Sequence, residues 1–367
     1  MNLSLTVEEI VSRARADMRM GAPIALVSAS GGALVLAAET ISSTRLDALR
    51  DLGPSAMDIA ISNRRAETLR ARAYDGQLAR VVLDEDADAG FVQATADPSV
   101  DLAHPMKGPY RTRREGPSDL HALALVLAKQ ARLLPAAVVA VWEDTAEVER
   151  IAADAGLSLL SEIMVHRAGA AAIRMTRVSG ARVPTRFAEA GRCHVFRPDD
   201  GGEEHYAVEV GKPARSAPVL SRLHSACFTG DVIGSLKCDC GPQLAAAMAQ
   251  IAEEGAGVLL YMNQEGRGIG LANKMRAYAL QDQGFDTVEA NHRLGFEDDE
   301  RDFRLGAEIL KAMGFSSVRL MTNNPNKTAM MEASGVAVQE RVPLKVGETD
   351  HNRAYLATKA AKSGHLL

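Results

Sequence analysis

The sequence predicts an α/β (α+β) protein of two domains. Its 367 residues exceed one ordinary domain and suit two of roughly 150–200 residues each. Short apolar runs of strand length alternate with helical stretches, which is typical of layered α/β folds. The texture changes around Met175–Pro184, where more polar, strand-like segments begin. We therefore expect one domain over residues 1–174 and a second over residues 175–367.

Apolar runs and their spacing predict the elements of the first half. Two buried strands are expected on either side of a Ser-Gly-Gly turn, at Ile24–Val27 and Ala33–Ala37. Helical spacing predicts a helix within Asp119–Leu134, and a buried strand follows at Ala136–Trp142. Two charged stretches are predicted to be loops with their charges in solvent: Asp84–Asp88 and Lys107–Arg114.

The second half begins with a predicted hairpin and continues with regular alternation. Its two strands are separated by a turn at Asp199–Gly202. A helix is expected to open near Pro242 and to end at Gly255. The remaining expected elements are a strand at Val258–Met262, a Gly-rich loop at Gln264–Gly270, helices at Asn273–Gln283 and Glu300–Met313, a strand at Val318–Met321, and a polar turn at Thr322–Lys327 that opens a last helix.

Composition excludes several classes of protein. The chain is 47% hydrophobic and 24% charged, as expected for a globular protein with a sizeable core. A net charge of -5 argues against a dedicated nucleic-acid binder. No apolar run reaches the roughly 18–20 residues that a membrane span needs, and the first residues do not resemble a secretory signal. We expect a cytoplasmic protein without nucleic-acid or membrane partners.

Three of the four cysteines lie within fourteen residues, as Cys227-x10-Cys238-x-Cys240. Three thiolates can bind zinc tetrahedrally and leave the fourth position to water, which is typical of catalytic zinc. Two alternatives stay open. The site could be structural and closed by a fourth ligand, for which the candidates are Cys193, His194, His224 and His292. The cluster could also bind no metal.

Three polar segments are further candidates for a nucleotide site. The loop Gln264–Gly270 lies between a strand and a helix, where glycines let backbone N–H groups approach phosphates, although a flexible turn would look the same. The charges at Asp298–Asp302 fall where a helix is expected to begin, and the helix dipole alone favours acids there. Thr322–Lys327 is equally suited to cradle a phosphate or to cap a helix.

Taken together, these segments resemble the GTP cyclohydrolase II family of riboflavin biosynthesis. The likeness is carried by SRLHSACFTGDVIGSLKCDCGPQL, YMNQEGRGIGLANKMRAYALQDQGFDTVEANHRLGF and TNNPNK, and runs from about Arg177 to the end. It implies zinc-dependent hydrolysis of GTP to 2,5-diamino-6-ribosylamino-4(3H)-pyrimidinone 5′-phosphate, formate and pyrophosphate. It also implies one zinc per subunit, magnesium with the triphosphate, and a homodimer.

The resemblance also implies roles for individual residues. Cys227, Cys238 and Cys240 match zinc ligands, Tyr278 matches a tyrosine near C8 of guanine, and its presence implies full deformylation. Asp299 matches a proton acceptor and Arg301 a nucleophile, while a phosphate clamp is the chemically simpler role for a guanidinium. Ala226 stands where the family usually has Glu, which can weaken GTP or metal binding. The residues matching substrate contacts are Arg222, Leu223, His224, Ser225, Ala226, Gln243, Glu265, Gly266, Arg267, Thr287, Thr322 and Lys327.

The first half resembles 3,4-dihydroxy-2-butanone 4-phosphate synthase, on ALVLAAETISSTRLDALRDLG, SNRRAETL and LVLAKQARLLPAAVVAVWED. Three features of that family are missing. Its acidic loop corresponds to Val27–Gly32, which has no acid, its Gly-His-Thr-Glu becomes Gly116–Asp119, and its later glutamate falls at Val141. Magnesium sites of this type need carboxylates, so we expect an inactive domain that serves in dimerisation, stabilisation or regulation.

Two other functions stay open at this point. The first is a bifunctional riboflavin enzyme whose synthase domain is active. The second is a non-catalytic GTP-binding regulator whose zinc is structural.

Overall fold

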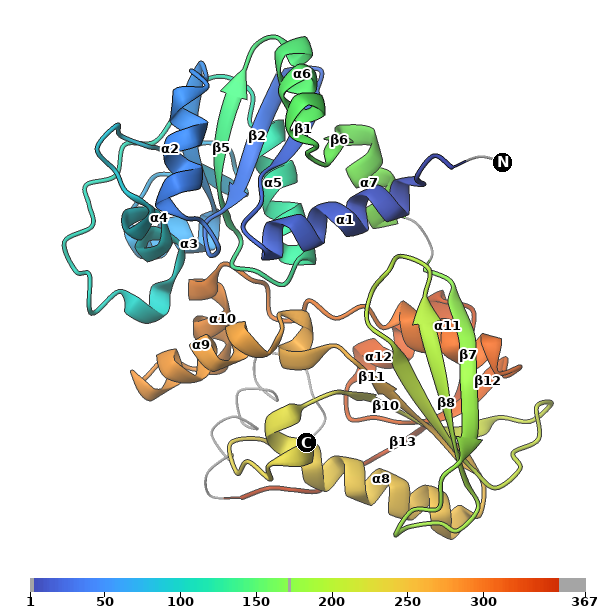
Figure 1. The fold of residues 1–367 in the computed structure, drawn as a ribbon. Helices are drawn as coiled ribbons and strands as arrows, with labels where there is room; N and C mark the ends of the chain where they lie inside the picture. Colours follow the sequence, from blue (N-terminus) through green and yellow to red (C-terminus); the bar gives the residue numbers. More distant parts are fainter. Residues whose placement is uncertain (1–2, 171–172, 350–367) are drawn as a thin grey trace. The chain divides into compact units, whose positions relative to one another are not determined.

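The computed structural model describes residues 3–170 and 173–349, and its chain forms two compact units (Figure 1). The first unit comprises Met1–Ala171 and Ala272–Asp298, and the second comprises Ala172–Leu271 and Asp299–Leu367. The chain therefore divides within three residues of the boundary expected from the sequence, but a segment of the second half belongs to the first unit. The last part of the expected second domain, residues 350–367, lies outside the described residues.

The first unit contains a six-stranded sheet in the order β4-β3-β5-β2-β1-β6. Neighbouring strands are antiparallel, except that β1 and β6 are parallel. The strands are β1 (Ile24–Ser28), β2 (Gly31–Ala37), β3 (Ala56–Ser62), β4 (Leu78–Val82), β5 (Ala136–Trp142) and β6 (Leu159–Ser161). All seven residues of β2 are buried, because helices cover both faces of the sheet.

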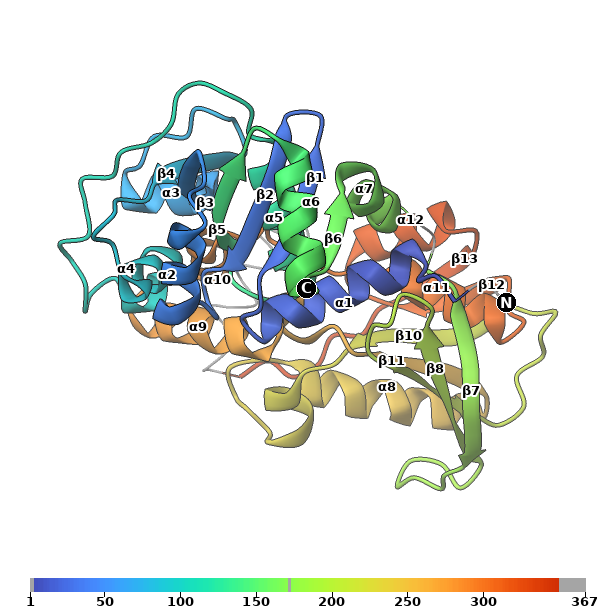
Figure 2. The ribbon, with the colours of Figure 1, turned by 45° about the horizontal axis from the view of Figure 1, so that its top comes forward.

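Helices α1, α3, α5, α6 and α7 of the first unit pack against this sheet (Figure 2). The helices of this unit are α1 (Val7–Arg19), α2 (Ser43–Asp51), α3 (Asn63–Leu69), α4 (Ala89–Ala96), α5 (Asp119–Gln130), α6 (Thr145–Ala155), α7 (Glu162–Ala170), α9 (Leu271–Asp282) and α10 (Thr287–Leu294), with a short 3-10 turn η1 (Pro98–Val100). Apolar residues of α1, α5 and α7 form one core with the strands. Helix α6 packs against β1 and β2, where Gly32 leaves room for Val148: a Cβ at Gly32 would lie 2.8 Å from the Val148 side chain.

The second unit contains a seven-stranded mixed sheet in the order β13-β12-β10-β11-β9-β8-β7. The four strands β13, β12, β10 and β11 are parallel to one another, and the sheet continues from β11 through β9, β8 and β7 by antiparallel pairing. The strands are β7 (Met175–Arg182), β8 (Gly191–Pro198), β9 (His205–Val210), β10 (Val219–Ser225), β11 (Gly257–Met262), β12 (Ser317–Met321) and β13 (Ala337–Val342).

Two apolar cores hold the helices of the second unit to its sheet. Helix α8 (Cys240–Glu254) packs through Ala247, Met248 and Ile251 in one core. The helices α11 (Arg304–Ala312) and α12 (Pro325–Ala333) belong to the other. Short helical turns follow two of the parallel strands: η2 (Phe228–Val232) and η3 (Glu265–Gly268).

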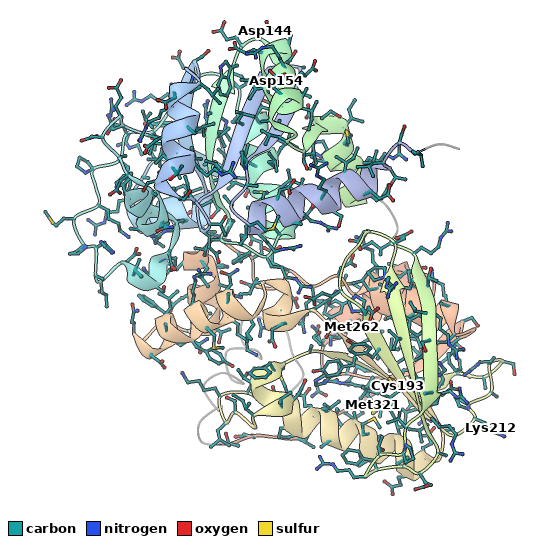
Figure 3. All side chains as sticks on the ribbon, viewed as in Figure 1. Asp144, Asp154, Cys193, Lys212, Met262 and Met321 are labelled. Carbon is teal, nitrogen blue, oxygen red and sulfur yellow. The ribbon has the colours of Figure 1, made fainter. Side chains whose placement is uncertain are left out.

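The parallel strands position the polar segments of the second unit. Parallel strands end at the same edge of a sheet, and ligands of open α/β sheets gather at their carboxyl ends. Ser225, Met262 and Met321 are the last residues of β10, β11 and β12, and Figure 3 labels the two methionines. The cysteine segment, the Gly-rich loop and the turn at Thr322 therefore all leave this edge.

Most elements expected from the sequence are confirmed, two expectations are wrong, and one helix was missed. The helix expected over Glu300–Met313 begins only at Arg304, with Phe303 as its N-cap residue, and the Asp302 side chain accepts the backbone N–H of Arg304 at 2.9 Å. Helix α10 was not expected. Lys107 and Arg113 are not simply solvated, because they form ion pairs with Asp101 and Asp58. Among the described residues no helix is long and apolar enough to cross a membrane.

Candidate metal and nucleotide site

Three cysteine thiols of the second unit converge on one point. The Sγ atoms of Cys227, Cys238 and Cys240 all lie within 4.8 Å of one another, and Cys227 and Cys238 are 3.7 Å apart. Tetrahedral zinc with Zn–S bonds of about 2.3 Å places its sulfur ligands about 3.8 Å apart. The donor set and its spacing therefore fit zinc. No other group of three metal-binding side chains occurs in residues 3–170 and 173–349, and neither Cys193 nor any of the candidate histidines joins this one.

The local chain explains why the thiols meet. Cys227 follows β10 and Cys240 opens α8, and the turn η2 between them brings Gly230 against the sulfurs. A Cβ at Gly230 would lie 2.8 Å from the Cys238 sulfur and 3.1 Å from the Cys227 sulfur, so only glycine fits. The backbone N–H of Gly230 donates to the Cys227 sulfur at 3.3 Å, which favours a thiolate there.

Without a cation the thiols hinder each other's ionisation. Contact with Cys227 raises the pKa of Cys238, and contacts with Cys227 and Cys238 raise the pKa of Cys240 well above its usual range. Burial adds to the effect at both. Negative charge is costly in this position unless a cation neutralises it, and a bound metal would reverse the balance.

A buried carboxylate braces the cysteine segment. Asp231 accepts hydrogen bonds from the Cys227 backbone N–H at 3.0 Å, from the Tyr261 hydroxyl at 2.9 Å and from His224 Nε2 at 3.0 Å. The rings of His224 and Tyr261 stack with centroids 5.5 Å apart. Burial lowers the pKa of His224, and Asp231 works in the opposite direction. Asp231 and Tyr261 were not among the residues expected from the sequence.

Two buried cations lie close to this group. Arg222 donates to the Met321 carbonyl at 2.9 Å and to the side-chain oxygen of Gln243, while its Nε has no hydrogen-bond partner among the described residues. Burial lowers its pKa to about 10, with Asp239 opposing the shift. Lys327 is 6% exposed and donates to the Leu223 carbonyl at 3.1 Å. Buried cations of this kind are suited to bind phosphate oxygens.

The Gly-rich loop is held by Glu265 and by the segment before α11. Glu265 accepts the backbone N–H groups of Phe228 at 2.6 Å and of Gly266 at 2.8 Å. Gly268 has φ +95°, and a Cβ there would lie 2.6 Å from the Glu300 carbonyl oxygen. Arg267 also has a positive φ, 59°, and its carbonyl accepts the Glu300 N–H at 3.0 Å. These contacts give the loop a defined conformation.

Asp299 and Arg301 form a bidentate ion pair in the second unit. Arg301 Nε donates to Asp299 at 2.7 Å, its NH2 to the other carboxylate oxygen at 2.5 Å, and its NH1 to the Ser225 hydroxyl at 3.3 Å. Burial works to raise the pKa of Asp299, but the hydrogen bonds and charge of Arg301 outweigh it, and the pKa is lowered. This carboxylate is ionised at neutral pH and is a weak base.

The remaining expected residues fall into two groups. In the second unit, Leu223 is buried in the core and offers only its carbonyl, and Ala226 donates its N–H to the Met262 carbonyl. Thr322 is 1% exposed, and its hydroxyl accepts the Asn324 N–H at 3.0 Å. Tyr278 lies on α9, with Lys274 Nζ 5.8 Å from its ring centroid, and Thr287 opens α10; both belong to the first unit.

In the first unit, the stretch Val27–Gly32, which corresponds to the acidic loop of the synthase family, carries hydroxyl groups instead of acids. Ser30 donates to both carboxylate oxygens of Asp119, at 2.6 and 2.8 Å, and also contacts the Ser28 hydroxyl at 2.9 Å. Burial works to raise the pKa of Asp119, but hydrogen bonds from Ser28 and Ser30 outweigh it and the pKa is lowered. Hydroxyls here satisfy a single carboxylate.

A cavity of about 910 Å³ also lies in the first unit. Its wall includes Glu39, Asp97, Lys107, Leu134 and Arg276. Its cations are engaged by acids of the same wall or next to it: Arg276 pairs with Glu39 and Asp97, and Lys107 pairs with Asp101.

Comparison with known proteins identifies relatives of the chain. The family model described as GTP cyclohydrolase II matches residues 176–343. A protein of Azospirillum brasilense named GTP cyclohydrolase-2 is 44% identical, over 97% of this chain and 94% of that protein. A Pseudomonas paraeruginosa protein of the same name is 57% identical over 190 residues, which are 52% of this chain and 92% of that protein. A solved two-domain 3,4-dihydroxy-2-butanone 4-phosphate synthase from A. baumannii is 17% identical, with a TM-score of 0.34, and covers 93% of this chain and 100% of its own.

Proposed function

The chain belongs to the GTP cyclohydrolase II family of riboflavin biosynthesis, and from this premise we propose that it hydrolyses GTP with the help of zinc. The proposed products are 2,5-diamino-6-ribosylamino-4(3H)-pyrimidinone 5′-phosphate, formate and pyrophosphate. The proposed zinc ligands are Cys227, Cys238 and Cys240. The proposal takes in the whole chain, because residues that it uses occur in both units.

One observation carries the proposal: three convergent thiols with no fourth protein ligand in the described group. A closed structural zinc normally has four protein ligands. A three-thiolate set supports a site with an open position, where zinc supplies hydrolytic power by lowering the pKa of a water molecule. This also argues against the alternative of a purely structural metal.

The cations of the second unit support binding of the triphosphate. Arg222 and Lys327 are buried, and a buried cation interacts strongly with an anion because water screens it poorly. The Nε donor of Arg222 has no partner among the described residues, so a phosphate oxygen would satisfy it. We propose that these two residues hold phosphate oxygens and that Gln243 orients Arg222.

We propose that Arg301 acts as a charge clamp during phosphoryl transfer. Its guanidinium is paired with the ionised carboxylate of Asp299, and an ionised carboxylate with a lowered pKa is poorly suited to remove a proton from arginine. A protonated guanidinium can stabilise the charge that develops on the transferring phosphoryl group. Asp299 then fixes the direction of the guanidinium, and Ser225 supports it from the strand end.

Recognition of guanine is assigned to the loop that Glu265 anchors. The carboxylate of Glu265 accepts the backbone N–H groups of Phe228 and Gly266 beside the Gly-rich loop. A carboxylate is an acceptor that matches the N1–H and N2–H donors that distinguish guanine from adenine. We propose this role for Glu265, with Gly266 and Arg267 as neighbouring contacts.

Several finer points stay proposals from the family resemblance. Tyr278 is proposed to act near C8 of guanine and to bring the reaction to complete deformylation. Magnesium is proposed to accompany the triphosphate, Thr287 and Thr322 to contact GTP, and the chain to work as a cytoplasmic homodimer. The first half is proposed to lack synthase activity.

Product analysis tests the function. The zinc-loaded chain is incubated with GTP and magnesium, and formate, pyrophosphate and the nucleotide product are quantified by mass spectrometry. Equimolar formate and pyrophosphate, lost after zinc is removed by a chelator and restored by added zinc, are expected. Unchanged GTP at a verified zinc content of one per chain would contradict the proposal and favour a binding role.

A further inference from the structure

A stretch of the family sequence packs inside the first unit. The GTP cyclohydrolase II match spans residues 176–343 and therefore includes 272–298, which form α9 and α10. These residues nonetheless belong to the same compact unit as Met1–Ala171. The segment 272–298 carries Tyr278 and Thr287, to which the proposed function gives roles.

Helix α9 is anchored by a partly buried polar clamp. Arg276 Nε donates to Asp97 at 2.9 Å, its NH2 lies 3.1 Å from a carboxylate oxygen of Glu39, and its NH1 donates to Asn273 at 2.7 Å. Asn273 is fully buried and donates to the Arg132 carbonyl at 3.1 Å. One arginine thus joins α9 to two acids from the first 100 residues of the chain.

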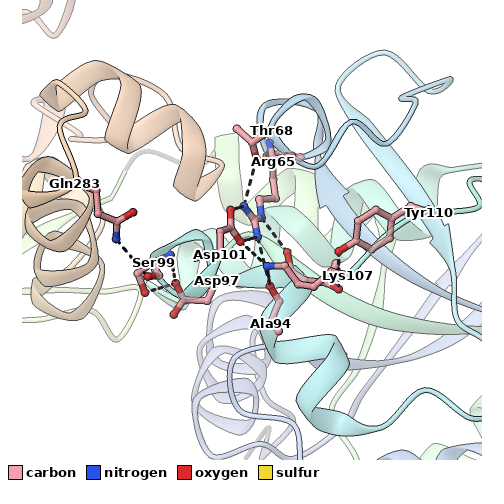
Figure 4. Close-up of polar contacts among 11 residues, drawn as sticks. Arg65, Thr68, Ala94, Asp97, Ser99, Asp101, Lys107, Tyr110 and Gln283 are labelled. Atoms are coloured by element: carbon pink, nitrogen blue, oxygen red, sulfur yellow. Dashed lines mark hydrogen bonds and ion pairs between the residues drawn. The ribbon is translucent and has the colours of Figure 1, made fainter. Parts of the chain in front are cut away.

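The two acids are themselves held rigidly. The other carboxylate oxygen of Asp97 accepts the N–H and hydroxyl of Ser99, and Glu39 accepts the Leu134 N–H at 2.8 Å. Figure 4 shows the surroundings of Asp97, in which Arg65, 1% exposed, forms a bidentate pair with Asp101. Gln283, after the end of α9, reaches the Ser99 carbonyl at 3.5 Å.

Helix α10 and the residues after it are held by a second set of contacts. Helix α10 packs against α3. Gly295, which ends α10 with φ +89°, lies so close that a Cβ would be 2.6 Å from the Ser62 hydroxyl and 2.8 Å from the Pro135 ring. Phe296 is 1% exposed, and Lys129 Nζ lies 5.8 Å from its ring centroid.

Both ends of the segment 272–298 continue directly into proposed site residues. Glu265 and Arg267 lie in η3, and only Ile269 and Gly270 separate η3 from the start of α9. At the other end His292 Nε2 contacts Asp298 at 2.8 Å, and Asp299 and Arg301 follow at once. Contacts that hold the segment 272–298 in place therefore also restrict the backbone on either side of it, where these residues lie.

We infer that the first unit is a scaffold that holds the segment 272–298 for GTP turnover, with Glu39 and Asp97 as positioning residues that act through Arg276. This role rests on the proposed function, and it gives the synthase-like half a task that needs no chemistry of its own. The Pseudomonas paraeruginosa relative matches only 52% of this chain, so the scaffold is a dependence of this longer chain rather than a requirement of the whole family.

The test removes the clamp charges and leaves the proposed site residues unchanged. In the full-length zinc-loaded chain, E39Q/D97N keeps the side-chain shapes but weakens both bonds to Arg276. We expect amides of residues 272–298 to exchange hydrogen about tenfold faster, as when a charge-assisted hydrogen bond is lost. We expect kcat for GTP to fall about tenfold or more at unchanged zinc content, since misplacement of reacting groups is costly.

The matched control is D75N. Asp75 forms a buried pair with Arg80 in the same unit, at 2.8 Å, but neither residue has a described hydrogen bond or ion pair to the segment 272–298. Its turnover and its exchange in 272–298 should equal those of the parent. If E39Q/D97N does not fold, the single variants E39Q and D97N provide the same comparison with smaller expected effects.

The outcomes separate the two proposals. Parent-like exchange in 272–298, or faster exchange with parent-like kcat, would overturn the scaffold. Equal losses in D75N would also overturn it, because they would show general destabilisation. If the parent itself does not turn over GTP, the proposed function fails, and hydrogen exchange still reports whether the clamp holds the segment.

Discussion

The turn between β1 and β2 in the first unit and the segment after β10 in the second unit both follow a buried strand. In the first unit, Ser28 and Ser30 give their hydroxyls to one carboxylate, Asp119, and that charge is satisfied within the protein. In the second unit, contacts within the thiol cluster raise the pKa of Cys238 and of Cys240, so a thiolate there is costly unless a cation neutralises it. A buried polar cluster whose hydrogen bonds and charges are all satisfied within the protein stabilises the fold. A cluster whose charged form is unfavourable without a counter-charge indicates a ligand site.

The comparison extends to the arginines of the two units. Arg65 and Arg80 of the first unit have their acids and carbonyls in place and are almost fully buried. Arg222 of the second unit is equally buried, but its Nε has no hydrogen-bond partner among the described residues. This difference supports the proposal that the second unit binds the charged substrate.

The largest effect is expected from loss of one thiol of the cluster. Cys227→Ser should abolish zinc retention and GTP turnover together, because serine is a poor zinc ligand. Zinc is measured by mass spectrometry after dialysis, and turnover by formate release. The control is Cys193→Ser, since Cys193 lies on β8 outside the cluster and should leave both quantities unchanged. Equal effects of the two substitutions would contradict the assignment of zinc to this cluster.

Arg301→Lys should lower kcat by about 10²–10³-fold, the cost of losing a positioned donor in the transition state. Lysine keeps the charge but cannot reproduce the bidentate pair with Asp299. Residual turnover in Arg301→Lys, with no phosphoguanosine adduct on the parent protein by intact mass, supports the clamp. A trapped adduct on Arg301 would contradict it.

Tyr278→Phe should change the identity of the product. If the hydroxyl is needed to complete deformylation, the formylated intermediate accumulates while pyrophosphate is still released. Mass spectrometry of the nucleotide product distinguishes the two species, which differ by one formyl group. Full formate release at the parent rate would show that the hydroxyl has no such role.

Asp231→Asn should weaken zinc binding by about 10–100-fold without removing a ligand, as is usual for groups that orient ligands. The amide loses part of its capacity to accept from the Cys227 N–H, Tyr261 and His224. Competition with a chelator measures the affinity. Tyr261→Phe removes one of these donors and should have a smaller effect in the same direction, whereas an effect larger than that of Asp231→Asn would refute the bracing role.

The smallest effect is expected in the first unit. Asp119→Asn should lower the free energy of unfolding by about 1–2 kcal/mol, the contribution of hydrogen bonds to a charged group, and leave GTP turnover unchanged. Because the pKa of Asp119 is lowered in the folded state, its stabilisation is present above the unfolded pKa of about 3.9. The difference between parent and variant should therefore shrink as the pH falls below about 4, measured by urea unfolding. A loss of turnover at full stability would assign this region a catalytic part.

Local sequence patterns predicted the cysteine cluster but did not predict the polar contacts around it. The spacing of Cys227, Cys238 and Cys240 was sufficient to predict a cluster, because η2 and the start of α8 lie within the same short stretch. Asp231 was missed because its contacts depend on the fold: one partner, Tyr261, is thirty residues further along, and His224 reaches it only across the turn after β10. A single aspartate in a turn gives no signal until the strands are placed.

Helix boundaries and long-range packing show the same limit. Helix α10 has a capping box in which Asp286 and Glu289 accept each other's backbone N–H groups, and this signal was readable in the sequence. The helix expected at Glu300 was misjudged because the residues before Arg304 make side-chain contacts instead of a helical turn: Asp302 accepts the Arg304 N–H, and Asp299 pairs with Arg301. The pairing of Arg276 with Asp97 spans 179 residues, and no periodicity reveals it.

The proposed function places the chemistry at the thiol-bearing site and gives the first half no synthase activity. One protein sample with a verified zinc content should be incubated with GTP and magnesium, and in parallel with ribulose 5-phosphate and magnesium, and both mixtures analysed by mass spectrometry. The account predicts the diaminopyrimidinone monophosphate with equimolar formate from the first and an unchanged pentose phosphate from the second. Unchanged GTP, or formation of 3,4-dihydroxy-2-butanone 4-phosphate, would contradict it.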